Sequence, residues 1–204
     1  MQTSLFDFGT PPQKDSYLFF DTETTGLPRN WNARAEDVDN WPRLVQLAWI
    51  QYDENGNVIA SENKIVRPDG YTIPADSSRI HGITTERALA EGIPVRQVLE
   101  TFCDKIGKST HIVAHNIDFD EKIIGAEFIR AEMNHDFQKK KKICTMKSTV
   151  DFCAIPSPRG YKWPQLSELH TKLFGEPFKD AHDASVDIAA TAKCFWELKK
   201  RGVL

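Results

Sequence analysis

The sequence predicts a single α/β domain in which a mixed β-sheet is flanked by helices. Strand-like segments come first and are joined by a tight turn, which indicates antiparallel pairing. Short apolar strands then alternate with amphipathic helices in the second half of the chain. A length of 204 residues, 40% of them hydrophobic, is enough to bury one sizeable core.

The N-terminal end is expected to be a flexible tail. Residues 1–16 contain Gly9, Pro11 and Pro12 among polar residues and show no sustained hydrophobic period. The domain proper is therefore expected to span residues 17–204. It begins with the apolar run Tyr17 to Phe20, which is typical of a central strand covered on both faces.

Two further strands are predicted at Leu44 to Tyr52 and Val58 to Val66. The segment between them, Asp53 to Asn57, contains an Asn-Gly pair that favours a hairpin turn. The remaining elements are expected, in chain order, as a helix over 95–106, a strand over 111–114, a helix with Phe119, Ile123, Ile124 and Phe128 on its inner face, a strand from Ile143, and helices over 164–174 and 184–201.

The cysteines and the hydropathy pattern predict a cytoplasmic protein. The four cysteines are far apart and form no Cys-x-x-Cys pair, so reduced thiols are expected rather than disulfides or a zinc site. No apolar run approaches the roughly 18 residues of a membrane span, and the N-terminus lacks the pattern of a signal peptide.

The first candidate site residues are Asp21 and Glu23, where the first strand ends. Side chains two positions apart in a strand share a face, so the two carboxylates are expected side by side. Their mutual repulsion favours a cation between them, and oxygen ligands suit Mg²⁺ or Mn²⁺. The same pair is also common where strands simply end in solvent.

A second block, His115 to Asp120, follows the predicted strand over 111–114 and opens a helix. Asp120 is expected in or near the first turn, where the helix dipole favours an anion. Phe119 is expected to anchor the turn in the core. For Asn116 or Asp118 alone, a role as N-terminal cap is the simpler interpretation.

A third block, His182 to Asp187, opens the last predicted helix. Five residues correspond to about 140° of rotation on a helix, so the two side chains would not share a face if both were helical. His182 is therefore expected just before the helix, from where it can swing over a site that Asp187 faces.

Together the three blocks resemble the DEDDh branch of the DnaQ-like 3′→5′ exonucleases. Their order matches the family pattern: Asp21-x-Glu23, Asn116-x-x-x-Asp120 and His182-x-x-x-x-Asp187. The stretches Phe20 to Gly26 and Ile80 to Thr84 also resemble the family, so the likeness runs from about Tyr17 to Trp196. It implies an RNase H-like fold with a mixed five-stranded sheet, and release of nucleoside 5′-monophosphates.

The resemblance also implies roles for the five residues. Asp21 would bridge two Mg²⁺ (or Mn²⁺) ions, Glu23 and Asp187 would complete one coordination shell, and Asp120 would hold the other ion directly or through water. His182 would be the general base, because an imidazole titrates at about 6.5, close to operating pH.

Substrate contacts are implied for further residues. The backbone N–H groups of Thr24 and Thr25 would contact the terminal 3′ hydroxyl, and Leu27 would wedge against the last base. The other candidates are Asn116, His81 and Phe119, although His81-Gly82 is equally compatible with a turn that merely packs. Two groups stay open between substrate contact and ordinary packing, namely Arg159, Tyr161, Lys162 and Trp163 in one loop and Trp31 and Trp41 in another.

The function predicted from the sequence is 3′→5′ exonuclease action on single-stranded or frayed DNA 3′ ends, in proofreading or repair. The formal net charge of −3 includes the four proposed site carboxylates, so the remainder of the chain carries +1 and is compatible with a nucleic-acid substrate. Trimming of RNA 3′ ends is the main alternative. A non-catalytic module that binds nucleic-acid ends is the other, but it has no need of four converging carboxylates.

The N-terminal tail carries a further motif. Gln2-Thr3-Ser4-Leu5-Phe6 resembles the short bacterial clamp-binding pentapeptide, in which Gln2, Leu5 and Phe6 would make the contacts. A sliding clamp and a DNA polymerase are therefore expected partners of an enzyme that is expected to be monomeric. The alternative is a chance match in a flexible end.

Overall fold

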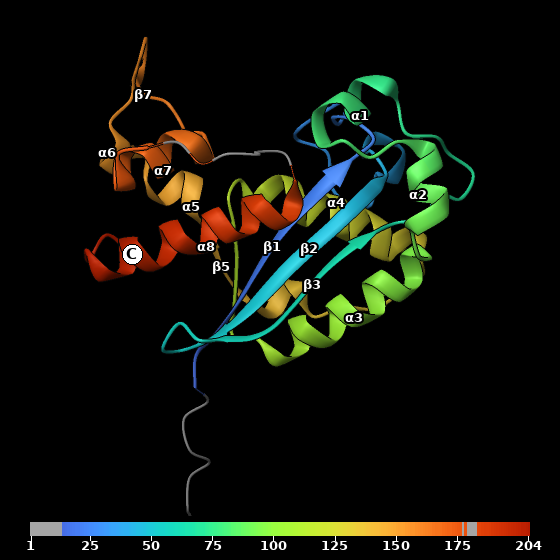
Figure 1. The fold of residues 1–204 in the computed structure, drawn as a ribbon, viewed down its shortest axis with the longest axis horizontal. Helices are drawn as coiled ribbons and strands as arrows, with labels where there is room; N and C mark the ends of the chain where they lie inside the picture. Colours follow the sequence, from blue (N-terminus) through green and yellow to red (C-terminus); the bar gives the residue numbers. More distant parts are fainter. Residues whose placement is uncertain (1–13, 177, 179–182) are drawn as a thin grey trace, which may run out of the picture.

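The computed structural model of the protein describes residues 14–176, 178 and 183–204 (Figure 1). The proposed clamp-binding residues Gln2, Leu5 and Phe6 and the proposed base His182 lie outside the described residues. None of the helices in the described part has the length and apolar character that a membrane span requires.

The centre of the fold is a five-stranded sheet in the order β3-β2-β1-β4-β5. The strands are β1 (Ser16–Thr24), β2 (Leu44–Asp53), β3 (Val58–Ile65), β4 (His111–Ala114) and β5 (Lys141–Cys144). β1 pairs antiparallel with β2 and parallel with β4, β2 pairs antiparallel with β3, and β4 pairs parallel with β5. The predicted mixed five-stranded sheet is confirmed, with β1 in its middle.

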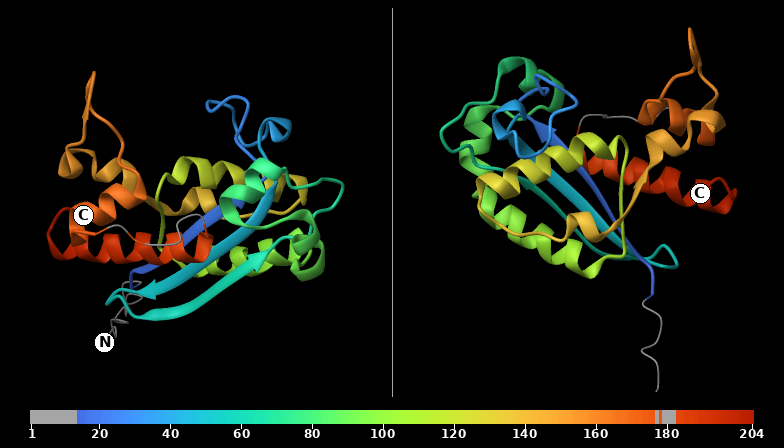
Figure 2. Two further views of the ribbon diagram at one scale, coloured as in Figure 1. Left: turned by 45° about the horizontal axis from the view of Figure 1, so that its top comes forward. Right: turned by 180° about the vertical axis from the view of Figure 1, so that it is seen from behind.

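Helices cover both faces of the sheet (Figure 2). On one face, α3 (Val95–Lys108) and α4 (Ile117–Arg130) pack on Leu18 and Phe20 of β1. On the other face lies α8 (Ala184–Lys200), which packs on Tyr17 and Phe19. Because side chains alternate along a strand, Asp21 and Glu23 continue the face of Tyr17 and Phe19 and are presented toward α8.

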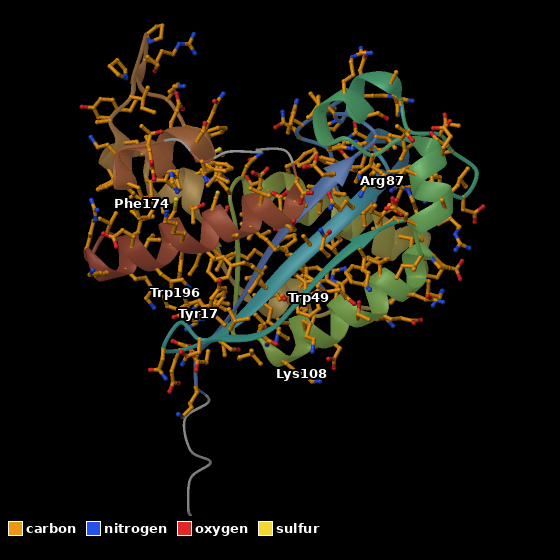
Figure 3. The ribbon with its side chains drawn as sticks, viewed as in Figure 1. Tyr17, Trp49, Arg87, Lys108, Phe174 and Trp196 are labelled. Carbon is orange, nitrogen blue, oxygen red and sulfur yellow. The ribbon has the colours of Figure 1, made fainter. Side chains whose placement is uncertain are left out.

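An aromatic cluster fixes α8 at the far end of β1. Tyr17 contacts Trp196 edge to face, with ring centroids 5.3 Å apart (Figure 3). Phe19 contacts Phe195 in the same manner at 5.1 Å. Such pairs contribute about 0.5–1.5 kcal/mol beyond the area they bury. The cluster therefore sets the position of α8 from the end opposite the carboxylates.

Two helices appear that the sequence pattern did not predict, α1 (Ala75–His81) and α2 (Thr85–Glu91). His81 ends α1, and Gly82 follows in the left-handed conformation with a φ of 74°, so this pair combines a helix end with a tight turn. The remaining small elements are η1 (Val38–Asn40), η2 (Phe137–Lys139), α5 (Thr145–Ser148), α6 (Val150–Cys153), the hairpin strands β6 (Pro156–Ser157) and β7 (Gly160–Tyr161), and α7 (Leu166–Phe174).

The segment between β1 and β2 is anchored on α4 by a buried ion network. Glu127 is 1% exposed and accepts hydrogen bonds from Arg43 Nε at 2.8 Å, from Arg130 Nη1 at 2.8 Å and from the Leu44 backbone N–H at 3.1 Å. Trp41 is buried beside this network, whereas Trp31 is exposed and contacts Phe119. The two tryptophans therefore differ: Trp41 anchors the loop in the core and Trp31 lies at its rim.

Candidate active site

Three of the predicted carboxylates meet at one edge of the sheet. Asp21 and Glu23 come from the end of β1, and Asp187 comes from the first turn of α8. One oxygen of each carboxylate lies within 4.8 Å of the others, a spacing at which one ion can contact all three. The donors are hard oxygen atoms, which fit Mg²⁺ or Mn²⁺.

The close approach of α8 to the sheet depends on small side chains. Ala48 on β2 is paired with Asp21 and packs against Ala184 and Ile188 of α8. A larger residue at position 48 would separate the helix from the strand. The helix start is fixed by Asp183, whose side chain accepts a hydrogen bond from the Ser185 backbone N–H at 2.8 Å.

Asp120 reaches the site from the other side of β1. It is 3% exposed in the first turn of α4, as predicted. One carboxylate oxygen accepts hydrogen bonds from the Thr22 backbone N–H at 3.1 Å and from the Thr22 hydroxyl at 2.7 Å. The structure therefore holds Asp120 through Thr22 next to the cluster, but does not include it in the group of three that meets within 4.8 Å.

The acidic residues of this site raise one another's pKa values. Burial and the charges of Asp187, Asp120 and Asp183 raise the pKa of Glu23 to about 8. Burial is also the main cause that raises the pKa of Asp120 to about 7 and the pKa of Asp21 well above its usual value, to which the neighbouring carboxylates add. Crowded carboxylates of this kind are charged at neutral pH only when a cation neutralises them.

Asp183 is a member of this acidic site that the sequence analysis did not single out. Its charge raises the pKa values of both Asp21 and Glu23, although its own carboxylate is engaged in capping α8. Its position directly before a predicted helix was the available signal, but that signal indicates a cap and not proximity to a sheet edge.

A cavity of about 220 Å³ opens beside Glu23. It brings together four of the predicted substrate-binding residues, Thr24, Leu27, His81 and Phe119. Leu27 is 72% exposed at the rim of this cavity. His81 is buried, its Nδ1 accepts a hydrogen bond from the Ile83 N–H at 3.2 Å, and burial lowers its pKa, so a neutral ring faces the cavity.

Two other predicted contacts are placed differently. The Thr25 N–H donates to the Arg43 carbonyl oxygen at 2.9 Å, so a bond from this group to a 3′ hydroxyl requires that hydrogen bond to break. Asn116 precedes α4 in the left-handed conformation, with a φ of 73°, and its side chain makes no capping hydrogen bond. Asp118, which the sequence analysis set aside, is exposed and forms an ion pair with Lys147.

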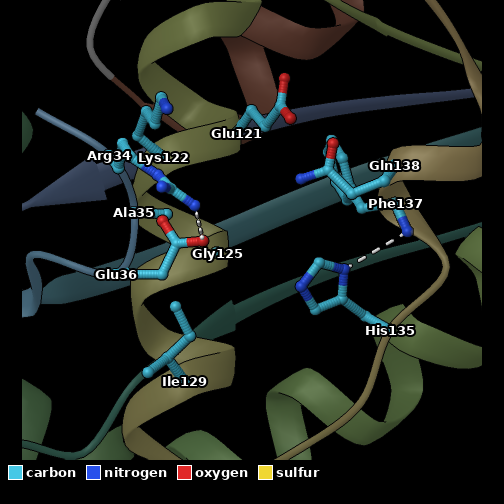
Figure 4. Close-up of a pocket in the computed structure, with 10 residues that line it drawn as sticks. All are labelled: Arg34, Ala35, Glu36, Glu121, Lys122, Gly125, Ile129, His135, Phe137 and Gln138. Atoms are coloured by element: carbon cyan, nitrogen blue, oxygen red, sulfur yellow. Dashed lines mark hydrogen bonds and ion pairs between the residues drawn. The ribbon is translucent and has the colours of Figure 1, made fainter. Parts of the chain in front are cut away.

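A second cavity of about 220 Å³ lies on the α4 face of the molecule, between α4 and the segment that follows β1 (Figure 4). It is lined by residues of mixed charge, among them Arg34, Glu36, Lys122 and His135. None of the predicted site residues lines it, so the carboxylate edge remains the candidate active site.

Comparison with known proteins identifies the family. A family model described as exonuclease (RNase_T) matches residues 18–195. The PolC-type DNA polymerase III of Streptococcus pneumoniae is 32% identical over 178 residues, which are 87% of this chain and 11% of that protein. The 3′-5′ exonuclease DinG of Staphylococcus aureus is 30% identical over 178 residues, 87% of this chain and 17% of that protein.

Solved structures show the same fold. E. coli Exonuclease I in complex with a dA16 oligonucleotide superposes with a TM-score of 0.71 at 23% identity, over 92% of this chain and 41% of that one. The zinc-bound E. coli Exonuclease I complex with single-stranded DNA superposes with a TM-score of 0.72 at 24% identity, over 92% of this chain and 41% of that one. The chain thus spans a minor part of each relative. With the RNase H-like fold and the family match over residues 18–195 in place, the chain belongs to the DnaQ-like exonuclease family, as its motifs predicted.

Proposed function

We propose that this chain is a metal-dependent 3′→5′ exonuclease that releases nucleoside 5′-monophosphates from DNA 3′ ends, in proofreading or repair. The observation that carries the proposal is the meeting of Asp21, Glu23 and Asp187 within 4.8 Å at the edge of the sheet. This edge adjoins the cavity lined by Thr24, Leu27, His81 and Phe119. A metal-dependent site and a place for a terminal nucleotide are therefore neighbours.

The acidic residues would hold two Mg²⁺ (or Mn²⁺) ions. Asp21 would contact both ions, Glu23 and Asp187 would complete the coordination of one, and Asp120 would support the other directly or through water. When bound, the ions would activate the attacking water and stabilise the leaving 3′ oxygen. His182 directly precedes Asp183, the N-cap of α8, in the sequence and would remove the proton from that water.

The cavity beside Glu23 would receive the last nucleotide of the substrate. Leu27 and Phe119 offer apolar contact to the base, and the neutral ring of His81 offers a hydrogen-bonding group at the buried end. Asn116, Thr24 and Thr25 are the remaining candidates for contacts to sugar and 3′ hydroxyl.

The relatives favour DNA over RNA, since a DNA polymerase is among the sequence matches and the Exonuclease I structures contain DNA oligonucleotides. The same carboxylates would also serve an RNA strand, since discrimination depends on how the pocket accommodates a 2′ hydroxyl. The proposed partnership with a sliding clamp and a polymerase rests on Gln2, Leu5 and Phe6 and on the PolC likeness.

The test compares initial rates on DNA and RNA oligonucleotides of matched sequence, with and without Mg²⁺. We expect hydrolysis of single-stranded DNA that stops when EDTA removes the ion. Faster hydrolysis of RNA would replace the DNA assignment by RNA trimming. Binding that persists without any hydrolysis in Mg²⁺ or Mn²⁺ would instead indicate a module that only binds nucleic-acid ends.

A further inference from the structure

A third cavity, larger than the two described above, adjoins the carboxylates on the side opposite Glu23. It has a volume of about 560 Å³ and is lined by Asp187, His115, Met146, Trp163, Pro164 and Phe178, among others. This volume lies within the range of about 300–1,000 Å³ that is typical of ligand sites. Since Asp187 also belongs to the carboxylate group, the cavity is continuous with the candidate active site.

This larger cavity and the cavity beside Glu23 lie on opposite sides of the carboxylates. The smaller one includes Glu23 and residues of α1, and the larger one includes Asp187 and the segment between β7 and α7. In Figure 1 the end of β1 and the start of α8 accordingly lie between α1 and the β6–β7 hairpin. A strand that lies across the carboxylates would therefore have one cavity on each side of the scissile phosphate.

Trp163 is the most exposed aromatic wall of this larger cavity. It is 61% exposed, yet the backbone on both sides of it is held firmly. Before it, the Lys162 N–H donates to the Ile155 carbonyl at 3.0 Å, and Lys162 Nζ pairs with Glu168 at 2.6 Å. After it, the Gln165 N–H donates to Glu168 at 2.8 Å. An exposed indole on a fixed backbone is preorganised for stacking.

Apart from Asp187, the described residues that line this cavity carry no charged side chain. His115 Nε2 lies 3.0 Å from the Pro164 carbonyl oxygen and its Nδ1 lies 2.9 Å from the Thr145 hydroxyl. Burial lowers the pKa of His115 to about 4, so the ring is neutral at physiological pH. Met146, Pro164 and Phe178 complete an apolar lining. Such a cavity suits a flat ring with an apolar face and, within the described part of the chain, offers no cationic side chain to a phosphate.

From this arrangement we propose that the cavity binds a nucleobase of the retained strand, stacked on Trp163, immediately upstream of the scissile phosphate. The inference rests on the proposed function, because it places the scissile phosphate at the carboxylates and the leaving nucleotide in the smaller cavity. A nucleobase combines the flat apolar face that the cavity fits with a link to a phosphate that reaches the metal site. Arg159, exposed in the β6–β7 turn, adds a positive charge on the same side for the phosphates further upstream.

The experiment measures equilibrium binding of a 5′-fluorescent single-stranded DNA oligonucleotide to the full chain in Ca²⁺, which permits binding without rapid hydrolysis. Three variants are compared with the parent: Trp163→Ala, Trp163→Phe, and Tyr161→Ala as the matched control. Tyr161 is also exposed on this segment, at 52%, but does not line the cavity. In parallel, the oligonucleotide carries an abasic residue at the second, third or sixth position from its 3′ end.

We expect Trp163→Ala to weaken binding of the intact oligonucleotide by about 5- to 150-fold, the usual effect of losing one base–aromatic stack. An abasic residue at the second position, whose base adjoins the scissile phosphate, should weaken binding to the parent by a similar factor but have little further effect on Trp163→Ala. Trp163→Phe should retain most of the affinity. Tyr161→Ala should stay within about twofold of the parent and keep the full abasic effect.

The assignment is overturned if Trp163→Ala leaves the affinity unchanged. It is also overturned if the effects of the variant and of an abasic residue at the second position multiply. The third and sixth positions should show no coupling to Trp163, and coupling confined to either of them would likewise overturn the assignment to the adjoining base. Since binding is measured without turnover, a failure here is distinct from a failure of the exonuclease proposal, which is judged by hydrolysis in Mg²⁺.

Discussion

At the scale of single residues, the cost of placing carboxylates together is the clearest physical sign of function. Asp21, Glu23 and Asp187 lie in a partly buried group, where their charges repel and burial disfavours ionisation. A protein that merely folded around this edge would gain stability from uncharged side chains at these positions. The arrangement is favourable once cations are bound, and it follows that binding and folding are coupled here.

Replacing Asp21 with Asn separates function from stability. Because Asp21 is proposed to contact both ions, Asp21→Asn should lower the hydrolysis rate by at least about 10²-fold, since ion contacts to the reacting phosphate contribute several kcal/mol. The same change removes a repelled charge, so the metal-free variant should melt at a higher temperature than the metal-free parent at pH 8. Calorimetry of Mg²⁺ binding completes the test, and an unchanged affinity would refute the role of Asp21.

Glu23 gives a prediction for pH dependence. Its pKa rises from 4.5 in the unfolded chain to about 8 in the folded, metal-free protein. The folded state therefore holds this proton more tightly, and the stabilisation is present below about pH 4.5 and is lost as the pH rises toward 8. Urea unfolding in EDTA at pH 5 to 8 should show this decline in the parent and a smaller one in Glu23→Gln. Equal slopes in both proteins would exclude Glu23 as its source.

The role of His182 as the proposed general base is tested by measuring turnover. His182→Ala should reduce turnover by about 10²–10⁴-fold, the usual contribution of general acid–base catalysis, while binding of substrate persists. Turnover within a few-fold of the parent would exclude His182 as the general base. A parallel fall in Mg²⁺ affinity would point to a different role in metal binding.

At the scale of elements, the sequence predicts the helices and strands whose buried side chains recur with a regular period. β1 is covered on both faces, and α3 buries Val98, Leu99, Phe102 and Ile106 at helical spacing, so both were found from hydrophobicity alone. α1 and α2 escaped prediction because their buried residues are small or polar: Ser77 and His81 in α1 and Ala88 in α2. The strands β6 and β7 have two residues each and leave no periodic signal.

The candidate site also has a part that could be predicted from the sequence and a part that could not. Asp21, Glu23, Asp120 and Asp187 could be singled out because each lies near the end of a strand or in the first turn of a helix, in a recognisable block. The hydrogen bonds from Thr22 to Asp120 and the pairing of Thr25 with Arg43 could not be predicted. They join residues 98 and 18 positions apart, respectively, through the packing of α4 and β2 on β1.

The end of α2 gives a test of packing between elements. A Cβ atom at Gly92 would lie 2.6 Å from the Arg67 backbone nitrogen and would collide with the Ala88 carbonyl oxygen as well. Gly92→Ala should therefore lower the free energy of unfolding by about 1–3 kcal/mol. Gly107→Ala in α3 is the matched control, because a Cβ there meets nothing within 4 Å, and a small gain of up to about 1 kcal/mol is expected. Chemical denaturation measures both, and equal effects would contradict this account of Gly92.

At the scale of the whole molecule, the site is a consequence of topology. The central strand β1 ends between helices from both faces of the sheet, so Asp120 of α4 and Asp187 of α8 approach Asp21 and Glu23 from opposite sides. The two cavities next to these carboxylates are contributed by separate parts of the chain, α1 on one side and the segment before α7 on the other. Under the proposed function, these two cavities would hold the nucleotides on either side of the bond to be cut.

The polarity and the product of hydrolysis test this account most directly. One copy of a single-stranded DNA oligonucleotide carries a label in its last 3′ nucleotide and a second copy carries it at the 5′ end, and both are digested in Mg²⁺. We predict that the first labelled product of the 3′-labelled copy is a nucleoside 5′-monophosphate, while the 5′-labelled copy shortens one nucleotide at a time. Early release of the 5′ label, short oligonucleotides as first products, or the same products in EDTA would contradict a metal-dependent 3′→5′ exonuclease.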